Sequence, residues 1–178
     1  MAKLMKRTAL VSVFAVLLLT GAYLLFPSGL LCSLAVTAGT TAYHFCMRLA
    51  VGYLFDRLMH NRADYRRPWF RPRPFEKKLY GFLRVREWKK RMPAYDPSLF
   101  SPQEHTLSEI AGAMCQAELV HEVIALCSFL PIAAIPFLGA PGVFIITSAL
   151  AAGFDLLFVM MQRYNRPRIV RLIDRQSR

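Results

Sequence analysis

The sequence predicts an all-α integral membrane protein with four transmembrane helices arranged as two hairpins. First, 55% of its 178 residues are hydrophobic although its formal net charge is +12, and soluble globular domains rarely combine these values. Second, four apolar segments approach the roughly 20 residues that a helix needs to cross a bilayer core of about 30 Å. The expected spans run roughly from Thr8 to Phe26, Leu30 to Phe55, Glu118 to Leu138 and Gly142 to Met161.

The first span has some features of a secretory signal. Lys3, Lys6 and Arg7 precede its apolar run, and the small residues Gly21 and Ala22 lie near its end. Its apolar stretch is longer than the usual signal core of roughly 7–15 residues. A retained helix is therefore favoured.

The placement of positive charge predicts the orientation. Of the 23 Lys and Arg residues, three precede the first span, thirteen lie between Arg57 and Arg91, six lie between Arg163 and Arg178, and Arg48 lies inside the second span. The two hairpin tips, at 27–29 and 138–142, carry no charge. Because cytoplasmic loops retain Lys and Arg, we expect a multi-pass protein of the inner cell membrane with both termini in the cytoplasm. Arg48 lies about two turns from the cytoplasmic end of its span and can snorkel, so structural anchoring is favoured for it.

The expected organisation has three parts: a transmembrane hairpin at 1–57, a basic cytoplasmic interfacial segment at 58–112, and a second hairpin with an arginine-rich tail at 113–178. In the middle part, prolines at 68, 72 and 74 preclude a continuous helix. Its cations and aromatic residues favour contact with anionic lipid over nucleic acid, because membrane spans flank it. The run from Glu76 to Met92 predicts one amphipathic surface helix.

The four cysteines indicate neither a metal site nor a redox motif. Cys32, Cys46, Cys115 and Cys127 form no CxxC pair and no Cys/His metal spacing. There is also no glycine-rich phosphate loop. We therefore expect no metal and no cofactor.

Ionisable residues at bilayer depth are costly and often functional, and here they gather in the second hairpin. Glu118, His121 and Glu122 are spaced i, i+3 and i+4, so they share one helical face. Glu118 lies 22 residues before Ala140 and Gln162 lies 21 after Pro141, which places both at one level. Asp155 is expected about 10 Å deeper. A structural ion pair between the two helices is the alternative interpretation.

Two motifs identify a family resemblance. Ala117-Glu118-Leu119-Val120-His121 and the string from Gln162 to Arg168 resemble the glycosyl-4,4'-diaponeurosporenoate acyltransferase family, over roughly Phe75 to Leu172. The resemblance implies a membrane acyltransferase of carotenoid biosynthesis that esterifies a fatty acyl group onto the sugar of a glycosylated carotenoid acid. Gln116, Glu122 and Asp155 depart from the family pattern.

This function suggests a role for each candidate residue. His121 is expected to act as general base, oriented by Glu118 or Glu122. Arg163, Arg166 and Arg168 would bind the phosphates of an acyl donor such as acyl-CoA. Tyr164 and Asn165 would position the glycosylated lipid acceptor, Trp88 and Lys89 would flank the entrance, and Gln162, Asp155 and Glu122 complete the expected substrate-binding set.

A second class of function is a non-catalytic membrane module that binds anionic lipid and supports a neighbouring biosynthetic enzyme. None of the four histidines is followed five residues later by an aspartate, so the His-x4-Asp pattern common among acyltransferases is missing. Nothing in the pattern predicts the oligomeric state, and no nucleic acid partner is expected.

Overall fold

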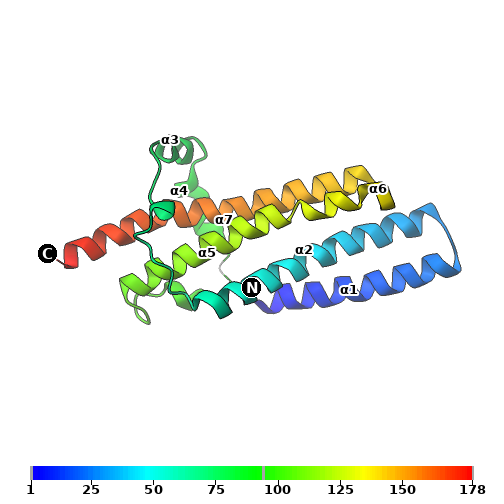
Figure 1. The fold of residues 1–178 in the computed structure, drawn as a ribbon, viewed down its shortest axis with the longest axis horizontal. Coiled ribbons are helices and arrows are strands. Elements are labelled where there is room, and N and C mark those ends of the chain that lie inside the picture. Colours follow the sequence, from blue (N-terminus) through cyan, green and yellow to red (C-terminus); the bar gives the residue numbers. More distant parts are fainter. Residues whose placement is uncertain (1, 94, 178) are drawn as a thin grey trace. The chain divides into compact units, whose positions relative to one another are not determined.

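The computed structural model describes residues 2–93 and 95–177, and all regular structure in those ranges is helical (Figure 1). Four helical segments are long and apolar enough to cross a membrane, which confirms the predicted fold class. The α-helices are α1 (Ala2–Leu25), α2 (Gly29–Met59), α3 (Pro74–Phe82), α4 (Val85–Trp88), α5 (Leu107–Cys127), α6 (Ile135–Leu138) and α7 (Pro141–Gln176). The 3-10 helices are η1 (Pro68–Phe70), η2 (Lys89–Arg91), η3 (Ser98–Phe100) and η4 (Leu130–Ala134).

The chain divides into two compact units, and α2, α5 and α7 contribute residues to both. The first unit comprises residues up to 52 together with 123–154, and the second comprises 53–122 together with the chain from 155 onward. In the first unit many large apolar side chains are exposed, as expected for a surface that faces lipid.

Polar ties inside the first unit connect its helices. The Tyr43 hydroxyl of α2 donates to the Cys127 carbonyl of α5 at 2.8 Å. Arg48 donates to the carbonyls of His44 at 3.2 Å and Ala151 at 3.3 Å. The bond to Ala151 ties α2 to α7, as the expected structural anchoring by Arg48 requires, and snorkelling of its guanidinium to the interface stays a prediction.

In the second unit, the chain that leaves α2 crosses close to α5. His60 and Asn61 take positive φ angles of 48° and 58° and turn the chain. The Asn61 backbone N–H then donates to the Gln116 side chain at 2.7 Å. A Cβ at Gly112 would lie only 2.9 Å from the Asn61 carbonyl, so this approach requires glycine. Next to the crossing, Phe70 and Cys115 belong to a buried apolar core.

The prediction of one helix from Glu76 to Met92 was wrong. The segment contains α3, α4 and η2, and Arg84 between α3 and α4 takes a left-handed conformation with φ of 49°. Val85, the residue directly after this break, is completely buried. Burial of this apolar side chain compensates for the strained residue before it. The prolines at 68, 72 and 74 do interrupt the chain as predicted, because only a short 3-10 helix forms at 68–70.

The second hairpin differs from its expected form at both ends. The helix of the third span ends at Cys127, and the chain continues through η4 and α6, because Pro131 and Pro136 lack the N–H that an α-helix needs. The last helix, by contrast, continues past Met161 and through Pro167 to Gln176. The arginine string is therefore part of α7 and not an extension that follows it.

Candidate functional site

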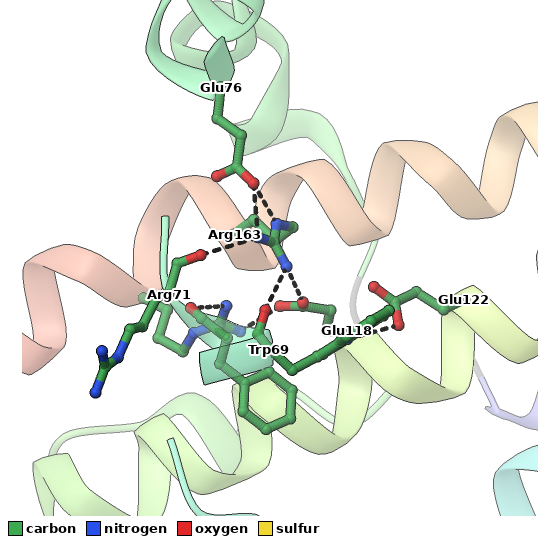
Figure 2. A network of polar contacts seen from close by, with 8 residues as sticks. Trp69, Arg71, Glu76, Glu118, Glu122 and Arg163 are labelled. Carbon is green, nitrogen blue, oxygen red and sulfur yellow. Dashed lines mark hydrogen bonds and ion pairs between the residues drawn. The ribbon is translucent and has the colours of Figure 1, made fainter. Parts of the chain in front are cut away.

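A buried ion network built around Arg163 connects four segments of the second unit (Figure 2). Arg163 Nη1 contacts Glu118 Oε1 at 2.6 Å, and Arg163 Nη2 contacts Glu76 Oε1 at 2.6 Å. The same guanidinium donates to the backbone carbonyls of Trp69 at 3.2 Å and Arg71 at 3.1 Å. All three of its nitrogens are used, since Nε also donates to Glu76. The network joins α7 to α3, to α5 and to the loop at 69–71.

Arg166 completes the network from the next turn of α7. Its Nη1 contacts the second carboxylate oxygen of Glu118, and its Nη2 donates to the Phe70 carbonyl at 2.7 Å. The guanidinium also lies 5.0 Å from the centroid of the Phe70 ring. Glu118 is fully buried and Arg166 is 2% exposed. Two arginines and two glutamates therefore neutralise one another in the interior, as buried charges must.

These contacts confirm the predicted level of the two motifs. Glu118 on α5 meets the arginine string of α7, as the residue count from the hairpin tip required. In these contacts the N–H groups of Arg163 and Arg166 already donate to acceptors within the protein. Binding of a substrate phosphate by either arginine would require an exchange of these bonds.

Tyr80 of α3 lies beside the network, and its hydroxyl stays protonated. Burial, followed by the negative charge of Glu76, raises the pKa of Tyr80 to about 12. The side chain is therefore a neutral hydrogen-bonding group at physiological pH.

His121 and Asp155 form a second polar contact between α5 and α7. His121 Nδ1 lies 2.8 Å from Asp155 Oδ1, and Phe158 stacks on the imidazole with a centroid distance of 4.4 Å and an interplanar angle of 7°. In a neutral imidazole, donation from Nδ1 to the carboxylate leaves the lone pair on Nε2. The His121 side chain is 23% exposed whereas that of Asp155 is 1% exposed. The imidazole is thus partly exposed, whereas the carboxylate that contacts it is buried.

The expected orienting carboxylates of His121 have other partners. Glu118 binds the two arginines, and Glu122 accepts from the Trp69 indole N–H at 3.1 Å. Asp155, predicted as a substrate-binding residue, is the carboxylate that contacts the imidazole. The three departures from the family pattern thus each make a defined contact, because Gln116 accepts from Asn61.

The remaining predicted residues gather around Tyr164. Lys89 contacts the Asn165 side-chain oxygen and lies 4.6 Å from the Tyr164 ring centroid. Arg168 lies 4.9 Å from the same centroid and donates to the Tyr164 hydroxyl at 3.1 Å. Burial and then the charge of Arg168 lower the pKa of Lys89.

The other two predicted residues do not join this group. The Trp88 indole N–H donates to the Leu83 carbonyl at 2.9 Å and so closes the turn after α3. Gln162 is buried on α7. Within 2–93 and 95–177, no group of three or more His, Cys, Asp or Glu residues is placed to hold a metal ion.

Sequence reasoning missed Glu76, Phe158 and the carbonyls of 69–71 as parts of this site. Glu76 had a usable signal, because it is an isolated acidic residue within a strongly basic segment. The backbone carbonyls carry no sequence signal, since every residue has one.

Comparison with known proteins connects this geometry to a family. A search of the curated proteins gave no match, and neither did a search of the solved structures. The family model described as glycosyl-4,4'-diaponeurosporenoate acyltransferase (CrtO) matches residues 66–175. The match includes the ion network and the His121–Asp155 pair, and it covers more than half of the 178 residues. The chain therefore belongs to the glycosyl-4,4'-diaponeurosporenoate acyltransferase family.

Proposed function

We propose that this protein is a membrane acyltransferase that transfers a fatty acyl group to a hydroxyl of a glycosylated lipid or carotenoid, with His121 as the general base. The observation that carries the proposal is the 2.8 Å contact between His121 Nδ1 and the buried Asp155 carboxylate. A base held in one tautomer by a carboxylate is what ester formation from a hydroxyl needs. Family membership supports the reaction class.

The reaction follows from this arrangement in two proton transfers. His121 Nε2 takes the proton of the acceptor hydroxyl as its oxygen attacks the acyl carbonyl carbon of the donor. The tetrahedral oxyanion then collapses, the bond to the leaving group breaks, and the imidazolium returns its proton to that group. One ester bond forms, one acyl bond of the donor breaks, and His121 ends neutral.

The other residues support this step by position. Asp155 fixes the tautomer and stabilises the transient imidazolium, and Phe158 fixes the plane of the ring. Glu118, predicted as a catalytic residue, is given a positioning role here, because it is fully buried and binds Arg163 and Arg166. Tyr164 and Asn165, with Lys89 against them, are assigned to the acceptor.

The decisive experiment compares lipid extracts from cells that contain the wild-type chain or His121→Gln. Mass spectrometry should detect a glycosylated lipid that gains one acyl chain only with the wild-type protein. Glutamine is close to histidine in size but cannot take the proton, so product formation should fall by about 10²-fold or more. His105→Gln is the matched control, because it makes the same exchange at a histidine that contacts Glu109 instead.

The alternative function, binding of anionic lipid without catalysis, is favoured by the exposed cations of the second unit. That function predicts that cells with His121→Gln, at normal levels of the protein, contain the same lipids as cells with the wild-type chain. Full product formation by the variant would exclude proton transfer by His121.

The proposed topology places both termini and the central segment in the cytoplasm of the cell that makes the protein. A cysteine introduced at Ser28, in a chain without native cysteines, should react with a membrane-impermeant maleimide added outside intact cells. A cysteine at Ser98 should react only after lysis. The reverse pattern would invert the orientation.

A further inference from the structure

Two adjoining hollows lie on the α7 face of the second unit, next to the ion network. One has a volume of about 680 Å³ and the other about 350 Å³. Both are lined by Pro72, Pro167 and Arg171, so they adjoin at these residues. The larger volume falls within the roughly 300–1,000 Å³ typical of small-molecule sites.

Cations from separate segments line both hollows. Arg66 and Arg71 of the loop before α3 face the larger hollow, Arg73 and Arg168 face the smaller, and Arg171 faces both. Across residues 2–93 and 95–177, none of these five arginines makes an ion pair with a carboxylate. Their remaining contacts are to neutral groups, such as the bond of 3.0 Å from Arg171 Nε to the Pro167 carbonyl. Two carboxylates also line the hollows, Asp174 at the larger and Glu76, which is paired with Arg163, at the smaller, so the protein balances the positive charge of this surface only in part.

The hollows are more than an exposed basic face, because apolar groups line them too. Phe70 is buried and contributes to the larger hollow together with Tyr65 and Val170. Asp174 is the acidic residue at the edge of that hollow. A ligand that matches this lining has an anionic group for the arginines and a flat or apolar part beside it.

The buried network fixes the geometry of the cationic side. The Arg71 carbonyl accepts from Arg163, while the Arg71 side chain extends away from the network (Figure 2). The Phe70 carbonyl is held in the same way by Arg166. The loop that supplies Arg71 is thus anchored to α7, and less ordering entropy is lost when a ligand binds.

We propose that these two hollows bind the phosphoryl group of the acyl donor, with Arg71 and Arg171 as its main ligands and Arg168 at the smaller hollow. Guanidinium groups bind phosphate oxygens through paired, charge-assisted hydrogen bonds. Two sources share this chemistry: the phosphates of a nucleotide thioester such as acyl-CoA, and the phosphodiester of a phospholipid. The inference rests on the proposed function, since it names the donor side of the same reaction.

The test measures binding apart from turnover. Full-length protein carrying His121→Gln is placed in nanodiscs of phosphatidylcholine, and coenzyme A is titrated by calorimetry. Arg71→Gln with Arg171→Gln should weaken coenzyme A binding by about tenfold or more. Lys90→Gln with Arg175→Gln removes the same charge from exposed positions that line neither hollow, and should leave the affinity within about twofold.

A second series distinguishes the two sources of phosphate. Nanodiscs that contain phosphatidylglycerol replace coenzyme A, and lipid that co-purifies with each variant is counted by mass spectrometry. Enrichment of phosphatidylglycerol that depends on Arg71 and Arg171, without coenzyme A binding, supports the phosphodiester as donor. Binding of neither probe, or equal losses in the control pair, overturns the site.

Failure of the site and failure of the proposed function remain distinguishable. Acylated product from the wild-type chain without probe binding would remove the donor site and keep the acyltransferase. Probe binding that requires Arg71 and Arg171 without any acylated product would keep the site and remove the acyltransferase.

Discussion

Two pairs of arginines on α7 show how burial decides what one residue type does. Arg163 and Arg166 are 9% and 2% exposed and are bound to Glu76 and Glu118. Arg168 and Arg171 are exposed and lack such carboxylate partners in the described part of the chain. An uncompensated charge is costly only away from water, so the first pair must be neutralised and the second need not be.

One cationic motif can therefore contain arginines that hold the fold together and arginines that are free to bind a ligand. Arg166 and Arg168 are two residues apart, which on a helix turns their side chains about 200° from each other. One direction leads to the buried Glu118 and the other to an exposed face beside Tyr164. Four predictions test this division, beginning with the largest expected effect.

Removing the central carboxylate should have the largest effect. Glu118→Gln leaves Arg163 and Arg166 buried with half of their compensating charge, and should lower the free energy of unfolding by about 3–5 kcal/mol. Denaturant unfolding in detergent measures this loss. Glu87→Gln is the matched control on an exposed residue and should change stability by no more than about 0.5 kcal/mol. Similar values for both would show that the network contributes no stability.

Exchange of one buried cation for another should have the next largest effect. Arg163→Lys keeps the charge but cannot reproduce the bonds to Glu76, Glu118 and two carbonyls, and should cost about 2–3 kcal/mol. Arg171→Lys at the exposed face should change the unfolding free energy by about 0.5 kcal/mol at most. Equal losses of unfolding free energy at the two positions would show that buried and exposed arginines of α7 do not differ in their contribution to stability.

Tyr80 predicts a pH dependence next to the network. An unfolded tyrosine ionises near its ordinary pKa of 10.0, whereas Tyr80 holds its proton until about 12. Between these values the unfolded chain binds fewer protons than the folded one, so stability falls as the pH rises. Tyr80→Phe should reduce this fall when melting temperatures are compared from about pH 9 to about pH 12. If the melting temperature of Tyr80→Phe falls with pH as steeply as that of the wild-type chain, the Tyr80 hydroxyl is not shielded from solvent.

The smallest expected effect is on stability at the exposed pair. Arg168→Gln with Arg171→Gln should alter the melting temperature by no more than about 2–4 °C, because both side chains are solvated. Their loss should still weaken coenzyme A or phosphatidylglycerol binding. A large drop in melting temperature would show that Arg168 and Arg171 stabilise the fold, as Arg163 and Arg166 do, instead of serving a ligand.

The sequence predicted the membrane fold and the meeting of two motifs, but it did not predict the contacts that depend on how the helices pack. Hydropathy and charge placed four spans, and a residue count from the hairpin tip placed Glu118 against the arginine string. The partner of His121 could not be predicted in the same way. A residue count gives the position of a side chain along the helix axis. It does not give the direction in which that side chain points relative to a neighbouring helix, and Asp155 is the carboxylate that points towards His121.

The sequence by itself determined the class of protein, because apolar length, positive charge and two family motifs are properties of the chain in order. The tertiary structure alone decided which arginines are buried. It brought Glu76, 87 residues from Arg163, into the interior and anchored the loop carbonyls of 69–71 to α7. The reason is physical: neutralisation of a buried charge depends on distances across the fold, and local sequence does not contain those distances.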